Sequence, residues 1–259
     1  MVGIGGGAPS EENDVRLGDV VVSCPTGKSG GVVHYDFGVA MQNKEFQRTG
    51  VLNTPPFSLL TAVQHLSSVH ERRGHNLSES INSTFTSNHR LKQKYERPPP
   101  TTDILYVSNF VHSIANKPCL GLCDGDLGHQ VPRPQRESPE NEPMVHYGLI
   151  ASADKLMKDA TVRDQLAETE KVLCFEMEAA GLLNAFPCLV IRGICDYSDT
   201  HKNDIWQGYA AAAAAAYARE LLHIIPALSQ AEATPQSADS ASTTGIHDAL
   251  KSFVSELAE

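Results

Sequence analysis

The chain has 259 residues, 41% of them hydrophobic, which is enough to bury one large α/β core or two small ones. Asp and Glu outnumber Lys and Arg by 31 to 21, and the formal net charge of −10 argues against a general nucleic-acid-binding protein, because an acidic surface repels phosphate backbones. No stretch approaches the roughly 18 apolar residues that span a bilayer. Residues 1–10 lack the features of a signal peptide, and six cysteines suit a reducing compartment. We therefore expect a cytoplasmic protein with no membrane and no nucleic-acid partner.

Short apolar runs rich in β-branched residues predict buried strands of the kind found in parallel sheets. These runs cover residues 19–23, 104–107, 146–151, 172–174 and 188–194. Helical patterns alternate with them, over residues 56–69, 154–166, 176–185 and roughly 203–222, the last with consecutive alanines from Ala210 to Ala216. The alternation predicts an α/β fold with a mostly parallel sheet and helices packed on it.

Other segments lack such patterns. Residues 75–102 are polar and residues 117–143 are rich in proline, glycine and charge, so both are expected to be surface loops or subdomain connections. Residues 229–244 have the composition of a linker. The apolar residues of 245–259 then fall on one face of a short amphipathic helix, which either docks on the domain or binds a partner.

Two partial motifs are set aside. Residues 26–29 resemble the end of a phosphate-binding loop, but that pattern needs a glycine where Val22 stands. Cys119 and Cys123, with His129 nearby, suggest a metal site, yet their spacing is unusual and no second ligand pair follows them. We expect free thiols there, and no metal or cofactor in the protein.

Three motifs carry chemistry that suits the edge of an α/β sheet. The glycine run Gly3–Gly7 lets backbone approach a ligand closely, although a plain turn explains it equally well. The carboxylates in Phe175–Gly181 follow an apolar run, and one carboxylate can accept two hydrogen bonds from a vicinal diol. Arg192–Asp199 lies at the carboxyl end of a predicted strand, where an Asp can donate a proton if burial raises its pKa.

These motifs, together with LGDVVVS (residues 17–23) and HYGLIAS (residues 146–152), resemble the nucleoside phosphorylase superfamily. The resemblance is strongest to its methylthioadenosine and S-adenosylhomocysteine nucleosidases. GGVVHYDFG (residues 30–38) and DTHKN (residues 199–203) are similar to the fungal type, in which this domain heads a multidomain receptor-like protein. Over residues 1–228 the resemblance implies a three-layer α/β/α fold with a central, mostly parallel mixed sheet, a homo-oligomer, and cleavage of the N-glycosidic bond of a purine nucleoside.

The resemblance also implies roles for single residues. Asp196 matches the acid that protonates the purine at N7, and Glu178 matches the carboxylate that holds the ribose 2′- and 3′-hydroxyls and favours the positive charge of an oxocarbenium-like sugar. Met177 matches the methionine that packs on the ribose, and Glu176 a second acid at the sugar end. The remaining candidates for substrate contact are Ile4, Gly5, Gly6, Leu156, Met157, Phe175 and Ser198.

Two questions stay open on the sequence. Phosphorylases of the superfamily place Ser or Thr where Ile4 stands, and Ile4 offers phosphate no donor, so hydrolysis is favoured over phosphorolysis. Family members also carry strands and a water-activating Glu ahead of the glycine run. Without them we expect an open apolar sheet edge and weak activity, and a nucleoside-sensing module of a larger protein becomes an alternative to an enzyme.

Overall fold

The computed structural model describes residues 1–231 except 87, 115, 116, 118, 120, 121, 124, 126, 137–141, 202 and 203. Residues Met1–Ile225 form one compact unit and Pro226–Glu259 a second one. The expected linker lies almost wholly, and the expected C-terminal helix entirely, outside the described residues. None of the described helices has both the length and the apolar character that crossing a membrane requires.

The strands are β1 (Val2–Gly7), β2 (Val20–Ser23), β3 (Val32–His34), β4 (Gly38–Val39), β5 (Gln47–Arg48), β6 (Val145–Ser152), β7 (Val172–Glu176) and β8 (Ile191–Asp196). The helices are α1 (Phe57–Arg73), α2 (Leu77–Thr86), α3 (His89–Tyr95), α4 (Ala160–Thr169), α5 (Ala179–Leu182) and α6 (Gln207–Ala231), with short 3₁₀ turns at Pro100–Thr102 and Leu127–His129. The chain is therefore a mixed α/β protein, as its sequence predicts.

The main sheet is mixed and closes on itself. Its order is β2-β8-β1-β7-β6-β3, and β2 also pairs with β6, so that the first five strands in this order form a ring. The pairings β1–β7 and β2–β8 are antiparallel, and the others in this sheet are parallel. The prediction of a mostly parallel mixed sheet is confirmed. Both sides of β1 are paired, so the glycine run does not lie at an open edge, while β3 pairs on one side with β6 in the described part of the chain.

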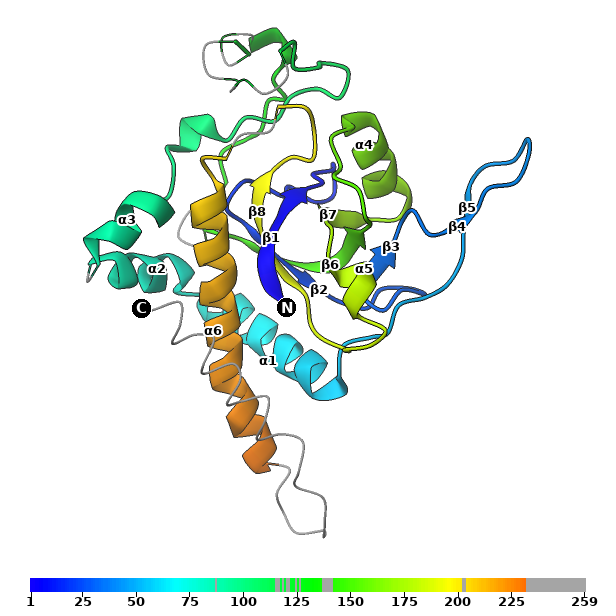
Figure 1. Cartoon of the computed structure of the whole chain (residues 1–259). Coiled ribbons are helices and arrows are strands. Elements are labelled where there is room, and N and C mark those ends of the chain that lie inside the picture. Colours follow the sequence, from blue (N-terminus) through cyan, green and yellow to red (C-terminus); the bar gives the residue numbers. More distant parts are fainter. Residues whose placement is uncertain are drawn as a thin grey trace. The chain divides into compact units, whose positions relative to one another are not determined.

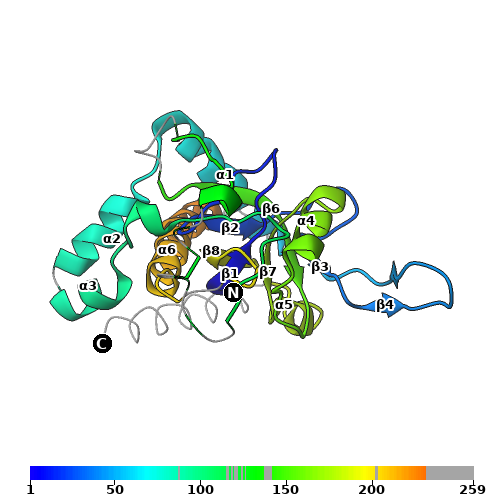
Figure 2. The same cartoon turned by 90° about the horizontal axis from the view of Figure 1, so that it is seen from above.

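Helices flank the ring on different sides. In both views α6 lies on the β8 side, near α2 and α3, whereas α4 and α5 lie on the side of β7 and β3 (Figure 1, Figure 2). The β4–β5 hairpin projects away from the ring. Helix α6 approaches β8 closely, since a Cβ at Gly193 would collide with the backbone of Ala210. The alanines of α6 permit this contact, and Ala210, Ala213 and Ala214 are fully buried.

Three local predictions differ from the structure. Residues 104–107 do not form a strand. Their β-pairing is limited to an isolated bridge between Tyr106 and Gln130. The segment 75–102 is not loop throughout but contains α2 and α3. Residues 154–159 precede α4 rather than belong to it, because the Asp159 carboxylate accepts the N–H groups of Thr161 and Val162 and so caps the helix there.

Candidate active site

Most of the predicted site residues line one small cavity beside the ends of β1, β7 and β8. The cavity has a volume of about 20 Å³ and is lined by Gly6, Lys155, Leu156, Met157, Phe175, Glu176, Met177, Asp196 and Ser198. The predicted residues Ile4, Gly5 and Glu178 do not line it. A volume of this size holds about one water molecule, so a purine enters only if side chains at the rim move.

Asp196 is the last residue of β8 and is buried. Its Oδ1 accepts the backbone N–H of Ser198 at 2.9 Å, and its Oδ2 lies 3.2 Å from the Cys195 thiol. Ser198 has a φ of 53°, a left-handed conformation that is uncommon for a residue other than glycine and tends to occur at functional sites. The turn after β8 therefore fixes the Asp196 carboxyl in the cavity wall.

The glycine run forms the central strand β1 and not a turn. Gly6 is paired on one side with Asp196 and on the other with Phe175. A Cβ at Gly6 would lie 2.6 Å from Asp196 Oδ1 and would collide with Ser198 Oγ. A side chain at this position would therefore displace the Ser198 hydroxyl and the Asp196 carboxyl.

The two carboxylates of the Phe175–Gly181 motif have different environments. Glu176 is buried, accepts the backbone N–H groups of Glu178 and Ala179, and pairs with Arg192. The Glu178 side chain is 59% exposed, and its Oε2 lies 2.8 Å from Arg192 Nη2. Of the two, only Glu176 lines the cavity with Asp196, whereas only Glu178 has a surface open to solvent.

The predicted helix of residues 176–185 is reduced to α5. Glu176 is the last residue of β7. Its carboxylate accepts the Ala179 N–H at the start of α5, and Ser152 Oγ accepts the Ala180 N–H at 2.9 Å. Met177 and Glu178 therefore form a short bend between β7 and α5. That bend places Met177 at the rim of the cavity with 40% of its surface exposed.

A second buried carboxyl, Asp199, follows Asp196 in the same turn. Burial raises the pKa of Asp199, and the negative charge of Asp196 raises it further. The Arg163 guanidinium and the His201 backbone N–H act in the opposite direction but do not cancel the increase. Arg163 Nη1 lies 3.7 Å from Asp199 Oδ2 and donates to the Tyr197 carbonyl at 2.8 Å. The turn is thus braced by a buried arginine on α4.

Sequence reasoning missed one residue of the cavity. Lys155 lines it next to the predicted Leu156 and Met157, and its ammonium lies 5.2 Å from the centroid of the Tyr35 ring. In the sequence, its position directly before the predicted residue Leu156 was the only indication that it could line the cavity. Lys155 is exposed, and it lies beside a cavity whose lining includes Glu176 and Asp196.

A cluster of four side chains of the types that can bind a metal lies outside the cavity. The imidazoles of His112 and His201 and the thiols of Cys119 and Cys123 place their ligand atoms within 4.8 Å of one another. His129, which the sequence analysis considered together with Cys119 and Cys123 as a metal ligand, stacks on Phe110 with a centroid distance of 4.3 Å. None of the four clustered residues lines the cavity with Asp196.

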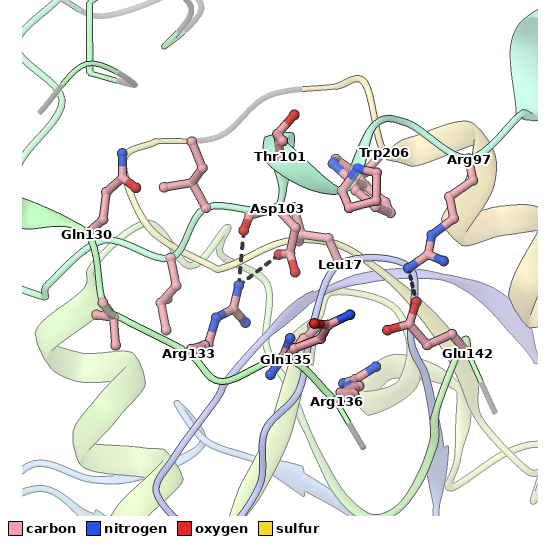
Figure 3. Close-up of a pocket in the computed structure, with 15 residues that line it drawn as sticks. Leu17, Arg97, Thr101, Asp103, Gln130, Arg133, Gln135, Arg136, Glu142 and Trp206 are labelled. Carbon is pink, nitrogen blue, oxygen red and sulfur yellow. Dashed lines mark hydrogen bonds and ion pairs between the residues drawn. The ribbon is translucent and has the colours of Figure 1, made fainter. Parts of the chain in front are cut away.

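A larger hollow of about 480 Å³ contains none of the predicted site residues. Figure 3 shows its arginines turned toward carboxylates, with Arg97 paired to Glu142 and Arg133 Nη2 to Asp103 Oδ1 at 3.0 Å. Arg136 likewise pairs with Asp19 at 2.5 Å. Because these guanidinium groups already have acidic partners, the hollow is not a ready anion site despite its size.

Comparison with known proteins gives sequence relatives. No family model matches the chain. It is 45% identical over 225 residues to a nucleotide-binding leucine-rich repeat (NLR)-like protein of Hyaloscypha variabilis, which covers 87% of this chain and 21% of that protein. The chain is a homologue of this fungal NLR-like protein. A stretch of 78 residues is also 33% identical to the ATP nucleosidase Cap17 of Escherichia coli, covering 28% of this chain and 15% of that protein. The expected similarity to a fungal multidomain protein is confirmed by this homologue.

The chain spans about a fifth of the length of its NLR-like homologue. Among solved structures, it aligns with the 5′-methylthioadenosine/S-adenosylhomocysteine nucleosidase of Neisseria meningitidis at a TM-score of 0.45 and 16% identity, over 85% of this chain and 67% of that one. Futalosine hydrolase of Helicobacter pylori aligns at a TM-score of 0.44 and 15% identity, over 86% and 66%. Both structural similarities are weak.

Proposed function

We propose that this chain cleaves the N-glycosidic bond of a purine nucleoside or nucleotide by hydrolysis, with Asp196 as the acid. The observation that carries the proposal is the buried Asp196 carboxyl, which lines a cavity together with Gly6, Ser198 and the Met177 rim. A carboxyl in that position can donate a proton to purine N7 and so turn the base into a better leaving group.

The contacts of the two glutamates suggest how the sugar is held. Glu176 already accepts backbone N–H groups and the Arg192 guanidinium, and its side chain is only 1% exposed. Glu178 is open to solvent and shares only the Oε2 side of its carboxylate with Arg192. Glu178 is therefore the better acceptor for two ribose hydroxyls, and its charge favours an oxocarbenium-like sugar.

The ligand would extend from Asp196 across Met177 to Glu178. The cavity is too small for this in its present form, but the two apolar side chains at its rim are free to move, since Leu156 is 50% and Met177 40% exposed. Side-chain rotation of this kind is common when a ligand binds. The ribose would then pack on Met177, as the family resemblance implies.

Water is proposed as the acceptor of the glycosyl group. Ile4 lies within β1 and offers phosphate no side-chain donor. Arg192, the nearest candidate for a phosphate clamp, is buried and engaged by two glutamates. The relative named as an ATP nucleosidase and the presence of Lys155 among the residues that line the cavity both support a substrate with a 5′-phosphate group.

The test is release of free base by the chain as it stands. We expect adenine from adenosine or ATP at a rate that does not depend on added phosphate, and the Asp196→Asn variant should lose at least about 10²-fold in rate. The amide keeps an oxygen for the Ser198 N–H, so the variant should fold and still bind the substrate. Unchanged turnover in Asp196→Asn would remove Asp196 from the mechanism, and phosphate-dependent release would favour a phosphorylase.

A nucleoside-sensing module is the second candidate. It is favoured by the homologue, an NLR-like protein of which this chain spans about a fifth. Calorimetry separates the two functions: tight binding of adenosine or ATP without base release supports the sensor. If the chain neither binds adenosine or ATP nor releases adenine from them, both functions are contradicted.

A further inference from the structure

We propose that His112, Cys119, Cys123 and His201 bind a zinc ion that anchors the turn carrying Asp196. Two thiols and two imidazoles whose ligand atoms all lie within 4.8 Å of one another form a donor set that suits zinc in a closed, four-coordinate structural site. The sequence analysis set the two cysteines aside because no second ligand pair follows them. The second pair comes from His112, seven residues before Cys119, and from His201, 82 residues after it.

Three of the six ligand-to-ligand distances lie near those of a tetrahedral zinc site, and all six lie within 4.8 Å. Zinc–sulfur bonds of about 2.3 Å and zinc–nitrogen bonds of about 2.0 Å place tetrahedral ligands roughly 3.3–3.8 Å apart. Cys119 Sγ lies 3.7 Å from His112 Nδ1 and 3.6 Å from His201 Nδ1, while Cys123 Sγ lies 3.0 Å from His112 Nδ1. Bringing the last pair to zinc geometry needs a shift of about half an ångström.

The orientation of His201 is already that of a ligand. Its Nε2 donates a hydrogen bond to the Phe110 carbonyl at 2.9 Å, because a carbonyl oxygen can only accept. The lone pair is therefore on Nδ1, the atom that faces Cys119. A ligand histidine that donates its other ring N–H to a backbone carbonyl is the usual arrangement at zinc sites. The ring is also stacked against Tyr106, with centroids 4.1 Å apart.

Backbone contacts join the two halves of the cluster independently of any metal. The His112 N–H donates to Thr200 Oγ1 at 2.9 Å, and His201 Nε2 donates to the Phe110 carbonyl at 2.9 Å. Within the turn after β8, the His201 N–H donates to Asp199 Oδ1 at 2.8 Å. Cys119, Cys123 and His201 are buried. A zinc ion here would tie His112, Cys119 and Cys123 to the turn that follows β8 and so hold Asp196 and Ser198 in place.

The metal content of the purified full chain tests this proposal. Elemental analysis after dialysis should find one equivalent of zinc per chain, and Cys119→Ser and Cys123→Ser should each retain well below one equivalent. Cys24→Ser is the matched control, because Cys24 is a partly buried cysteine outside the cluster and should leave the zinc content unchanged. Equal zinc in all four proteins, or equal loss in Cys24→Ser, would overturn the assignment.

A second measurement avoids variants that fail to fold. The wild-type chain, stripped with a chelator and titrated with Co²⁺, should develop thiolate-to-cobalt charge-transfer absorption and the visible bands of tetrahedral cobalt, saturating at one equivalent. Zn²⁺ should then displace the signal. Absence of these bands, or a mass showing a Cys119–Cys123 disulfide without bound metal, would contradict the proposal. Neither readout depends on nucleoside cleavage, so the zinc site and the proposed function fail separately.

Discussion

Arg192 Nη2 lies 2.8 Å from Glu178 Oε2, and the same guanidinium pairs with the buried Glu176. One cation on β8 thus holds both carboxylates of the bend between β7 and α5. Because Glu176 is fixed by backbone N–H groups as well, Glu178 is the partner that a ligand can draw away from Arg192. The arrangement links the fold of the bend to the sugar-binding role proposed for Glu178.

The first prediction concerns this ion pair. Replacing Arg192 with Met leaves the Glu176 carboxylate buried without its cation, and the expected loss in free energy of unfolding is about 3–5 kcal/mol. Urea denaturation followed by circular dichroism measures it. Arg48→Met is the control, because its pair with Glu170 is partly exposed and should contribute no more than about 1 kcal/mol. Adding Glu176→Gln to Arg192→Met should recover part of the loss; a loss below 1 kcal/mol in the single variant would contradict the buried pair.

The second prediction concerns Gly6. An alanine there places its Cβ against Asp196 Oδ1 and Ser198 Oγ, so the carboxyl must move. Displacement of about 1 Å can lower a rate roughly 10²-fold, and we expect a loss of this size in base release. Gly181→Ala is the control, because its Cβ would meet nothing within 4 Å and alanine favours the helix. Equal activity in the two variants would show that Asp196 is not constrained by β1.

Local patterns predicted the buried strands well because those strands are short apolar runs. β2 and β7 are buried along their whole length, and the runs 146–151 and 188–194 likewise contain much of β6 and β8. The run 104–107 has the same pattern but forms no strand. The polarity of residues 75–102 concealed a signal that was present: Leu77, Ile81 and Phe85 recur every four residues and form the buried face of α2. The average polarity of this segment led to the prediction of a loop, whereas the spacing of its apolar residues predicts a helix.

Other features depend on distant contacts that spacing does not reveal. The glycine run forms a strand because it pairs with β7 and β8, which lie far along the chain, and a Cβ at Gly3 would collide with the Arg192 guanidinium. The closure of the sheet through β2 and β6 is likewise a tertiary pairing. The clustering of His112 and His201 around Cys119 follows from the path of two loops. The motifs identified the residues of the cavity, while the fold decides which of them line it.

The third prediction tests whether the substrate carries phosphate. Lys155 lines the cavity and Lys158, three residues later, does not. If an anionic 5′ group binds near Lys155, Lys155→Met should raise the KM for ATP about 3- to 5-fold at low salt and leave the KM for adenosine unchanged. Lys158→Met should change neither. An equal effect of Lys155→Met on both substrates would point to packing at the cavity rather than to recognition of phosphate.

The last prediction concerns acid stability and Asp19, the buried residue before β2. Its carboxylate accepts hydrogen bonds from Arg136 Nη1 at 2.8 Å, His146 Nε2 at 2.9 Å and the Met144 N–H at 3.0 Å. Burial alone would raise the pKa of Asp19, but the hydrogen bonds from Arg136 and His146 outweigh it and leave the pKa below 3.8. A carboxyl whose pKa is lower in the folded state contributes stability above its unfolded pKa and loses it as the pH falls through the folded value.

The free energy of unfolding of Asp19→Asn should accordingly fall below that of the wild type by about 3–5 kcal/mol at pH 7, because Arg136 loses its buried partner. The difference should begin to shrink as the pH drops below about 3.8, where the unfolded chain takes up a proton, and should vanish once the pH has fallen through the lower pKa of the folded carboxyl. Urea denaturation at a series of pH values measures both. Glu12→Gln, which removes an exposed pair with Lys171, should show no such dependence. A difference that is constant with pH would mean that packing of the Asp19 side chain, and not its charge, stabilises the start of β2.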